Sequence, residues 1–193
     1  MTLPLTPRPE VLDFLLTRRS RPAKTLAEPG PGRTELETLL RAAARTPDHG
    51  KLEPWRFVVL GRQARVLITA AVRARGAELD LDPDAIEKAA GAFGQGPVIV
   101  AVVASPKASE KIPEWEQLMS AGAVCLSLLN AALAAGWGAN WLSGWPARDR
   151  ETLAAIEIAE PEFVAGFIHI GTETVAPPDR PRPDVAAITR WLD

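Results

Sequence analysis

The sequence is poor in residues that bind metals or form covalent crosslinks. Cys125 is the single cysteine of the 193-residue chain, so no intrachain disulfide and no cysteine-based metal cluster can form. The two histidines, His49 and His169, have a separation that fits no common metal site. We therefore expect no bound metal. Because Cys125 lies in an apolar segment, we expect it to be an inert core thiol.

Neither sign of charge dominates the chain. It has 22 lysines and arginines against 24 aspartates and glutamates, for a formal net charge of -2. This balance excludes the extended basic surface that nucleic acids and anionic membranes attract, so any anion site must be local. The N-terminal residues include no apolar signal segment, and we expect a cytoplasmic protein. The length and the 47% hydrophobic content suit one domain over residues 1–193.

One uncharged stretch, residues 118–135, approaches the length of a membrane span. It contains polar and small residues, among them Ser120, Gly122, Ser127 and Asn130. A helix that is apolar on all sides is more often a central core helix, or a helix shared with a second subunit. We therefore favour a core or dimer helix over a membrane span, and expect no membrane partner.

Hydrophobic periodicity and turn residues predict alternating helices and strands that form an α+β sandwich. A capping box over residues 34–37 marks one helix start. A proline-rich segment at 172–193 is expected to form an extended arm that closes with a helical turn near 185–192. The predicted helices cover 9–18, 34–45, 63–75, 83–92, 113–136 and 147–156, and the predicted strands cover 56–60, 98–103, 138–142 and 163–170.

Two arginine groups lie near opposite ends of the chain. Arg18 and Arg19, followed by Ser20, stand at the end of the first predicted helix, and Arg180 and Arg182 stand on the proline-rich arm. Guanidinium groups match phosphate geometry and serine adds a short donor, so the first group suits a phosphorylated ligand. The same arginines could instead serve the helix dipole, and the arm could be a solvated tail.

A polar loop carries a third set of candidate residues. Arg45 ends the second predicted helix and His49 follows it in a turn, just before an apolar strand. The arginine could serve only the helix dipole, and a lone loop histidine usually faces solvent. At this position, however, an imidazole could donate a hydrogen bond to the polar edge of a cofactor.

Residues 136–145 combine three tryptophans with three glycines. Tryptophan faces stack on flat aromatic ligands, and glycines let backbone donors approach them; filling of the core is the alternative. The chain has no GxGxxG fingerprint, P-loop, nucleophile elbow or paired-carboxylate arrangement. Its polar residues therefore suit the binding of a cofactor that itself performs the chemistry, as in a redox enzyme.

In this order the segments resemble the nitroreductase family of FMN-dependent oxidoreductases, in particular its compact YdjA-like branch. The resemblance implies a nitroreductase-like three-layer sandwich, with a small, mostly antiparallel sheet flanked by helices and a long central helix at a homodimer interface. It covers almost the whole chain and is carried by Arg18-Arg19-Ser20, Arg45-x-Pro47-Asp48-His49, Pro54-Trp55, Trp115-Glu116-Gln117, Met119-Ser120-Ala121-Gly122, residues 136–144 and residues 167–171.

The resemblance also implies roles for individual residues. Arg18, Arg19 and Ser20 would hold the phosphate and ribityl region of FMN, with Arg182 as a further phosphate contact. Arg45 and His49 would make further flavin contacts, His49 on the flavin of the partner subunit. The residues expected beside the isoalloxazine are Trp141, Leu142 and Ser143, and those expected at NAD(P)H are Ala131, Ala132, Leu133, Ala134, Ala135 and Gly136.

The implied activity is transfer of hydride from NAD(P)H through FMN to a nitroaromatic, quinone-like or other small electrophilic acceptor, by ping-pong kinetics in one shared pocket. The chain departs from the larger nitroreductases at one loop: Glu53 stands where they typically have glutamine, and Lys51 adds a nearby charge, so the acceptor is not inferred from those enzymes. Two alternatives remain open. One is a flavoenzyme of the same fold that oxidises or cleaves a dedicated metabolite, and the other is a non-catalytic helical dimer that binds a partner or an aromatic ligand.

Overall fold

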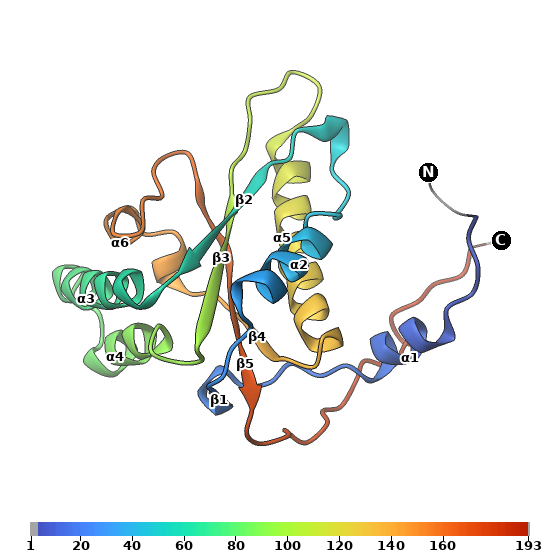
Figure 1. Cartoon of the computed structure of the whole chain (residues 1–193). Helices are drawn as coiled ribbons and strands as arrows, with labels where there is room; N and C mark the ends of the chain where they lie inside the picture. The colour runs from blue at the N-terminus through green and yellow to red at the C-terminus, as the bar shows by residue number, and fades with distance from the viewer. Residues whose placement is uncertain (1–3, 193) are drawn as a thin grey trace.

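The computed structural model describes residues 4–192, which form a mixed helix and sheet structure around five strands (Figure 1). The sequence predicts most of these elements, with boundaries within a few residues. The strands are β1 (Leu26–Ala27), β2 (Trp55–Leu60), β3 (Val98–Ala104), β4 (Gly138–Leu142) and β5 (Phe163–Glu173). The α-helices are α1 (Pro9–Thr17), α2 (Arg33–Ala43), α3 (Arg62–Glu78), α4 (Pro83–Ala92), α5 (Glu114–Ala134) and α6 (Arg150–Ala154).

Strand β5 organises the sheet, because it pairs with β1, β3 and β4, while β2 pairs with β3. All of these pairings are antiparallel. The β-branched run of β3 is buried on both faces, as expected for a strand covered by helices on each side. Alternate residues of β5 therefore point to opposite layers: Phe167 faces one core, and Ile168 and Ile170 face the other.

Helices cover both faces of the sheet and make a three-layer sandwich (Figure 1). Residues of α3, α4 and α6 pack with Ile99 and Val103 of β3 in one core. Residues of α2 and α5 pack with Val100 and Val102 in the other. The predicted α+β sandwich with a small antiparallel sheet is confirmed.

The long apolar helix α5 belongs to this sandwich. Among the described residues it is the one helix long and apolar enough to cross a membrane. Eight of its residues are buried, including Val124, Cys125 and Leu128, which pack in the core shared with α2 and the sheet. Gly136 ends the helical run at φ 86°, in the left-handed region that glycine tolerates. The prediction of a core helix is confirmed.

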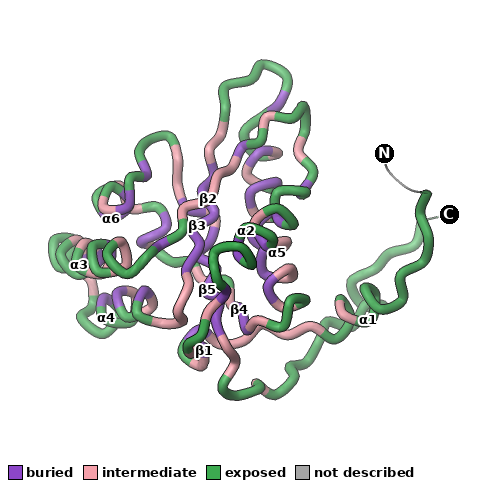
Figure 2. The backbone as a smooth tube through the Cα atoms, in the orientation of Figure 1, coloured by how far each residue is buried: buried purple, intermediate pink, exposed green. Residues whose placement is uncertain are grey.

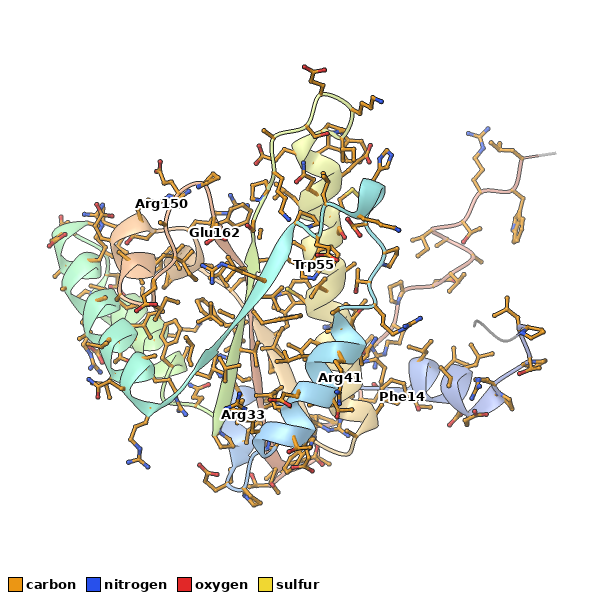
Figure 3. All side chains as sticks on the ribbon, turned by 45° about the horizontal axis from the view of Figure 1, so that its top comes forward. Phe14, Arg33, Arg41, Trp55, Arg150 and Glu162 are labelled. Carbon is orange, nitrogen blue, oxygen red and sulfur yellow. The ribbon has the colours of Figure 1, made fainter. Side chains whose placement is uncertain are left out.

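The turn that precedes β5 is held by two arginines from distant elements. Arg56 of β2 places Nε 2.8 Å from Oε1 and Nη2 2.6 Å from Oε2 of Glu162, a bidentate ion pair. Arg150 of α6 donates to the backbone carbonyl of the same glutamate. Figure 3 shows Arg150 and Glu162 on neighbouring segments at this end of the sheet. The pair lowers the pKa of the Glu162 carboxyl, chiefly through the hydrogen bond from Arg56.

Several local predictions were wrong. Helix α2 begins at Arg33, so Thr34 does not cap it; instead the carboxylate of Glu35 accepts a hydrogen bond from the backbone N–H of Gly32, the N-cap. The proline-rich loop after α1 contains a 3₁₀ turn and the short strand β1. The sequence 147–156 is split between a 3₁₀ turn at Trp145–Ala147 and α6. Residues 185–188 make a turn, and no helix forms in the described part of the arm.

Helix α1 and the C-terminal arm project away from the sandwich (Figure 1). Figure 2 shows both segments largely exposed. Their exposed residues include large apolar side chains, and further ones lie on α5. These side chains are Val11, Leu12, Leu15 and Leu16 of α1, Val185, Ile188, Trp191 and Leu192 of the arm, and Trp115, Met119 and Leu126 of α5. The chain by itself therefore leaves many large apolar side chains of α1, α5 and the arm uncovered.

Candidate flavin site

A cluster of arginines lines a hollow of about 330 Å³ between the end of α1 and the end of α5. Arg18, Arg19 and Arg21 contribute to its wall together with Phe14, which Figure 3 shows on α1. Nη2 of Arg18 lies 3.0 Å from Oγ of Ser20, and Nη1 of Arg19 lies 3.3 Å from the Ser20 carbonyl oxygen. The predicted triplet is thus folded into one compact turn.

The C-terminal arm brings a further arginine to this cluster. Nη2 of Arg182 lies 3.4 Å from the backbone oxygen of Arg18 and 3.0 Å from Oδ1 of Asp179. Burial lowers the pKa of Arg18, and the positive charges of Arg182, Arg19 and Arg21 lower it further. Two acidic groups accompany these arginines: Glu173, which also lines the hollow, pairs with Arg21, and the exposed Asp179 pairs with Arg182, which leaves Arg18 and Arg19 without an acidic partner among the described residues. The hollow therefore carries an excess of positive charge.

Two polar atoms in this cluster are buried without a protein partner among the described residues. They are Nε of Arg18 and Nε of Arg19. A buried, unpaired N–H is costly, and two such groups on neighbouring guanidiniums are satisfied by an anion with several acceptor oxygens. The donor set, its charge and its unpaired atoms fit a phosphate group.

The arginine turn is fastened to the sheet. The backbone N–H of Arg21 donates to the Ala139 oxygen at 2.8 Å, and Nδ2 of Asn140 donates to the Arg21 oxygen at 2.9 Å. These bonds fix the position of residues 18–21 relative to β4. Three residues after Asn140 the chain reaches Ser143, so the structure places the arginines and the tryptophan-glycine segment along the same strand.

A second hollow, of about 450 Å³, lies at the other end of β4. Its wall includes Leu118 and Gly122 of α5 together with Ser143 and Gly144. Leu133, which lines the arginine hollow, is eleven residues from Gly122, so the two positions share one face of α5 about 16 Å apart. The two hollows thus lie one after the other along α5 and β4, and we call them together the trough. An extended mononucleotide can span its length.

The residues expected beside the flavin ring lie between these hollows. Trp141 and Leu142 are the last residues of β4, and Ser143 enters the second hollow. The indole of Trp141, which is 37% exposed, rests against Gly166 of β5, where a Cβ would collide with it. Part of the role of Trp141 is therefore structural packing, the alternative left open by composition.

The structure does not bring Arg45 and His49 into these hollows within one chain. His49 lies in a 3₁₀ turn at the start of α5, and its Nδ1 is 2.8 Å from Oε2 of Glu116. The segment before this turn lies against α5, where Oγ1 of Thr46 is 2.8 Å from Oγ of Ser127. Arg45 is exposed, and no hydrogen bond or ion pair links it to the arginine hollow among the described residues.

Glu116 is a functional candidate that residue patterns alone did not single out. It lies in the first turn of α5, where the helix dipole favours a carboxylate. Its partner His49 is 67 residues away in sequence, and no local spacing indicates the contact. The segment 131–136 covers the last turn of α5 and the two residues that follow it. Leu133 and Gly136 line the arginine hollow, and the alanines carry no polar side chain.

Comparison with known proteins decides what kind of protein carries this site. The Nitroreductase family model matches residues 15–172, about four-fifths of the chain. The chain belongs to the nitroreductase family. Nitroreductases are oxidoreductases that use FMN. The matched region includes every residue of the arginine turn and of the tryptophan-glycine segment, and it leaves out Arg182.

Two curated nitroreductases are similar in sequence. The Escherichia coli (strain K12) protein named "Putative NAD(P)H nitroreductase YdjA" is 36% identical over 163 residues, which cover 84% of this chain and 88% of that protein. A Haemophilus influenzae protein, "Putative NAD(P)H nitroreductase", is 34% identical over 164 residues, with the same coverage of both chains, 84% and 88%. The resemblance to the YdjA-like nitroreductases is confirmed.

Solved nitroreductases share the fold. A nitroreductase-like protein from Bacillus cereus superposes with a TM-score of 0.78 at 19% identity, over 100% of this chain and 98% of that chain. A nitroreductase from Bacteroides fragilis, solved with bound FMN, gives a TM-score of 0.73 at 21% identity, over 95% of this chain and 99% of that chain. At these identities the likeness concerns the fold alone.

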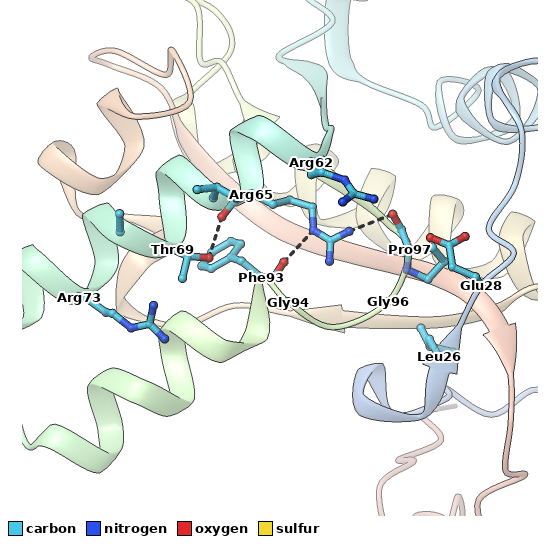
Figure 4. Close-up of a pocket in the computed structure, with 12 residues that line it drawn as sticks. Leu26, Glu28, Arg62, Arg65, Thr69, Arg73, Phe93, Gly94, Gly96 and Pro97 are labelled. Atoms are coloured by element: carbon cyan, nitrogen blue, oxygen red, sulfur yellow. Dashed lines mark hydrogen bonds between the residues drawn. The ribbon is translucent and has the colours of Figure 1, made fainter.

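A further hollow, of about 810 Å³, lies on the opposite side of the sheet, along α3 (Figure 4). Arg65 donates from Nε to the Phe93 oxygen at 2.7 Å and from Nη1 to the Pro97 oxygen at 3.0 Å. Arg73 is paired with Glu87 at 2.8 Å. These arginines mainly hold the 93–97 turn and α4 in place, so this hollow differs from the arginine cluster near Arg18.

Proposed function

We propose that the protein is an FMN-dependent NAD(P)H oxidoreductase that reduces small electrophilic acceptors such as nitroaromatics or quinones, with ping-pong kinetics. The observation that carries the proposal is the set of arginines with two buried, unpaired Nε atoms at one end of a trough along α5 and β4. An anionic phosphate joined to a flat ring fits both ends of that trough. The YdjA-like relatives support NAD(P)H as the donor.

In this proposal, Arg18 and Arg19 bind the phosphate through the unpaired Nε atoms, and Arg182 adds a donor from the arm. Ser20 orients the Arg18 guanidinium by accepting its hydrogen bond and contacts the ribityl region. Trp141, Leu142 and Ser143 flank the ring, and backbone groups of this loop face the second hollow. When bound, FMN supplies hydride transfer between NAD(P)H and the acceptor.

The proposed assembly is a cytoplasmic homodimer with its flavins at the interface. The exposed apolar side chains of α1, α5 and the arm support a second copy as the covering surface. In such a dimer Arg45 and His49 of one chain would serve the flavin held by the other chain, because they lie away from the arginine hollow of their own chain. Residues 131–136, beside the arginine hollow, are the proposed contact for NAD(P)H.

The test is spectroscopic and uses freshly purified protein. We expect a yellow protein with a flavin absorbance band that bleaches when NADH or NADPH is added without oxygen, and that returns when a nitroaromatic or quinone acceptor follows. A colourless protein that binds no added FMN would refute the proposal. A flavin that neither NADH nor NADPH reduces quickly would instead favour the alternative of a dedicated metabolite oxidase.

A further inference from the structure

A separate cavity, of about 360 Å³, lies beside the loop that follows β4, on the α4 side of the sheet. Helix α4 forms one wall through Ala89 and Ala92, and Trp145 and Phe167 form another. The volume lies at the small end of the range for ligand pockets, which suits a molecule of one or two rings. The wall is mostly apolar, and its one lysine, Lys88 of α4, is exposed to solvent, so a charged ligand is disfavoured inside.

The cavity is preformed, because its floor is fixed by two independent side chains. His169 of β5 is 1% exposed, and its Nδ1 is 2.9 Å from the Gln95 backbone oxygen. Arg65 holds the carbonyls on both sides of Gln95, those of Phe93 and Pro97 (Figure 4). The edge-to-face contact of Phe93 with Phe167, whose centroids are 5.0 Å apart, completes the floor.

The hydrogen bond of His169 fixes the polarity of its other ring nitrogen. A backbone carbonyl can only accept, so Nδ1 carries the proton and Nε2 presents a lone pair. Burial lowers the pKa of His169, so the ring is neutral near pH 7. Nε2 has no hydrogen-bond partner in the described part of the chain, and the side chain of Trp145 lines the same cavity.

We infer that this cavity binds a small neutral aromatic alcohol of the phenol class. The ring packs among Ala89, Phe167 and Trp145, and the hydroxyl donates to Nε2 of His169. A hydroxyl suits this wall because its proton can be donated to the lone pair of Nε2, whereas the ring is accommodated by the apolar side chains. The site lies on the α4 side of the sheet, whereas the proposed flavin trough follows α5, so the two ligands do not compete for one space.

The cavity touches the proposed flavin loop directly. Leu142, Ser143 and Gly144 line it, and Ser143 and Gly144 also line the second hollow of the trough. A ligand in the cavity therefore contacts the same loop residues, Ser143 and Gly144, that the proposed flavin ring contacts from the second hollow. This coupling rests on the proposed function, whereas binding of the aromatic alcohol does not.

The test compares p-cresol with 4-methylanisole, which has a similar shape but no hydroxyl proton, on the protein as purified. Amide chemical shifts should move for Ala85, Ala89 and Gln95 with p-cresol. Methylation of the hydroxyl should weaken binding roughly fivefold, the loss of one neutral hydrogen bond. Equal affinity for both probes, or shifts confined to Leu118 and Gly122 in the trough, would overturn the inference.

A pair of variants provides the control. Ala89→Leu fills the cavity and should abolish these p-cresol shifts, while Ala74→Leu adds the same side chain to an exposed position of α3 and should leave them unchanged. Persistence of the shifts in Ala89→Leu would count against the site. Flavin absorbance, recorded on the same samples, reports separately on the proposed function. A colourless protein that still binds p-cresol would refute the proposed flavin function and leave the aromatic-alcohol site standing.

Discussion

Arg182, on the C-terminal arm, lies with its Nη2 3.4 Å from the backbone oxygen of Arg18, at the end of the first helix. The contact joins two segments 164 residues apart and brings a further guanidinium to a site that already holds like charges. In the proposed function, this contact gives a role to an arm that has no buried residue from 178 onward among those described. Such an arrangement is favourable when an anion binds between the arginines.

Removing Arg182 should weaken FMN binding without unfolding the protein. We expect Arg182→Ala to raise the Kd for FMN by about three- to tenfold, because an exposed, charge-assisted contact contributes about 1 kcal/mol. Arg18→Ala should cost more, about tenfold or above, since its Nε is buried. Fluorescence titration of flavin-stripped protein measures both constants. Arg190→Ala, on the same exposed arm, is the control, and equal affinities for it and Arg182→Ala would exclude the arm from the site.

The pair formed by His49 and Glu116 should matter for turnover more than for stability. Their side chains are 60% and 31% exposed, so the contact between them contributes under about 1 kcal/mol to folding. We expect His49→Ala and Glu116→Gln to change kcat or the flavin potential, and the double variant to resemble either single one, because Glu116 acts through His49. Glu114→Gln, in the same turn of α5, serves as the control. Fully additive effects on kcat would show that the two residues act independently.

His169 should make the folded protein less stable in acid. Burial lowers its pKa from the ordinary value of 6.5, with a further contribution from Arg65, so the unfolded chain takes up a proton first as the pH falls. The stabilisation is complete above pH 6.5 and declines as the pH falls from there toward the lower folded pKa. Urea unfolding at pH 7.5 and 5.5 measures this loss. His169→Phe should show a smaller difference between the two pH values; an unchanged difference would assign the effect to other groups.

Cys125 should be unreactive while the protein is folded. The thiol is fully buried in α5, and burial raises its pKa to about 12, so almost no thiolate exists at pH 8. We expect no reaction with a thiol-specific disulfide reagent in the native state and one equivalent of reaction in urea. Rapid labelling of the native protein would mean that α5 opens locally from the sheet.

Elements with strong local patterns were predictable. The β-branched run of β3 and the long uncharged run of α5, which a glycine follows, are each recognisable from local sequence. Both elements begin and end within a few residues of the predicted bounds. The start of α2 was placed wrongly because Thr34 and Gly32 are both possible caps, and only the folded chain shows that Glu35 bonds to Gly32. Strand β1 was missed because two residues between prolines have no periodicity, and pairing with β5 alone makes them a strand.

The site was predictable in part, for the same reason. Arg18, Arg19 and Ser20 are adjacent in sequence, so their closeness in space could be inferred before the fold was known, and their joint binding of a phosphate stays a prediction. Glu116, Asn140 and the cavity beside His169 could not, because each depends on a contact between distant segments. A hydrogen bond between residues 67 or 119 positions apart cannot be predicted from the residues near either partner.

The layers of the sandwich follow from the amino-acid sequence, since the burial of apolar residues follows from their spacing along each helix and strand. The sequence also determined which residue types were present to bind a phosphate and a flat ring. Tertiary structure alone decided that Arg182 reaches Arg18 and that His49 lies away from the arginine cluster of its own chain. These outcomes depend on how the chain crosses the sheet, and no local preference specifies that path.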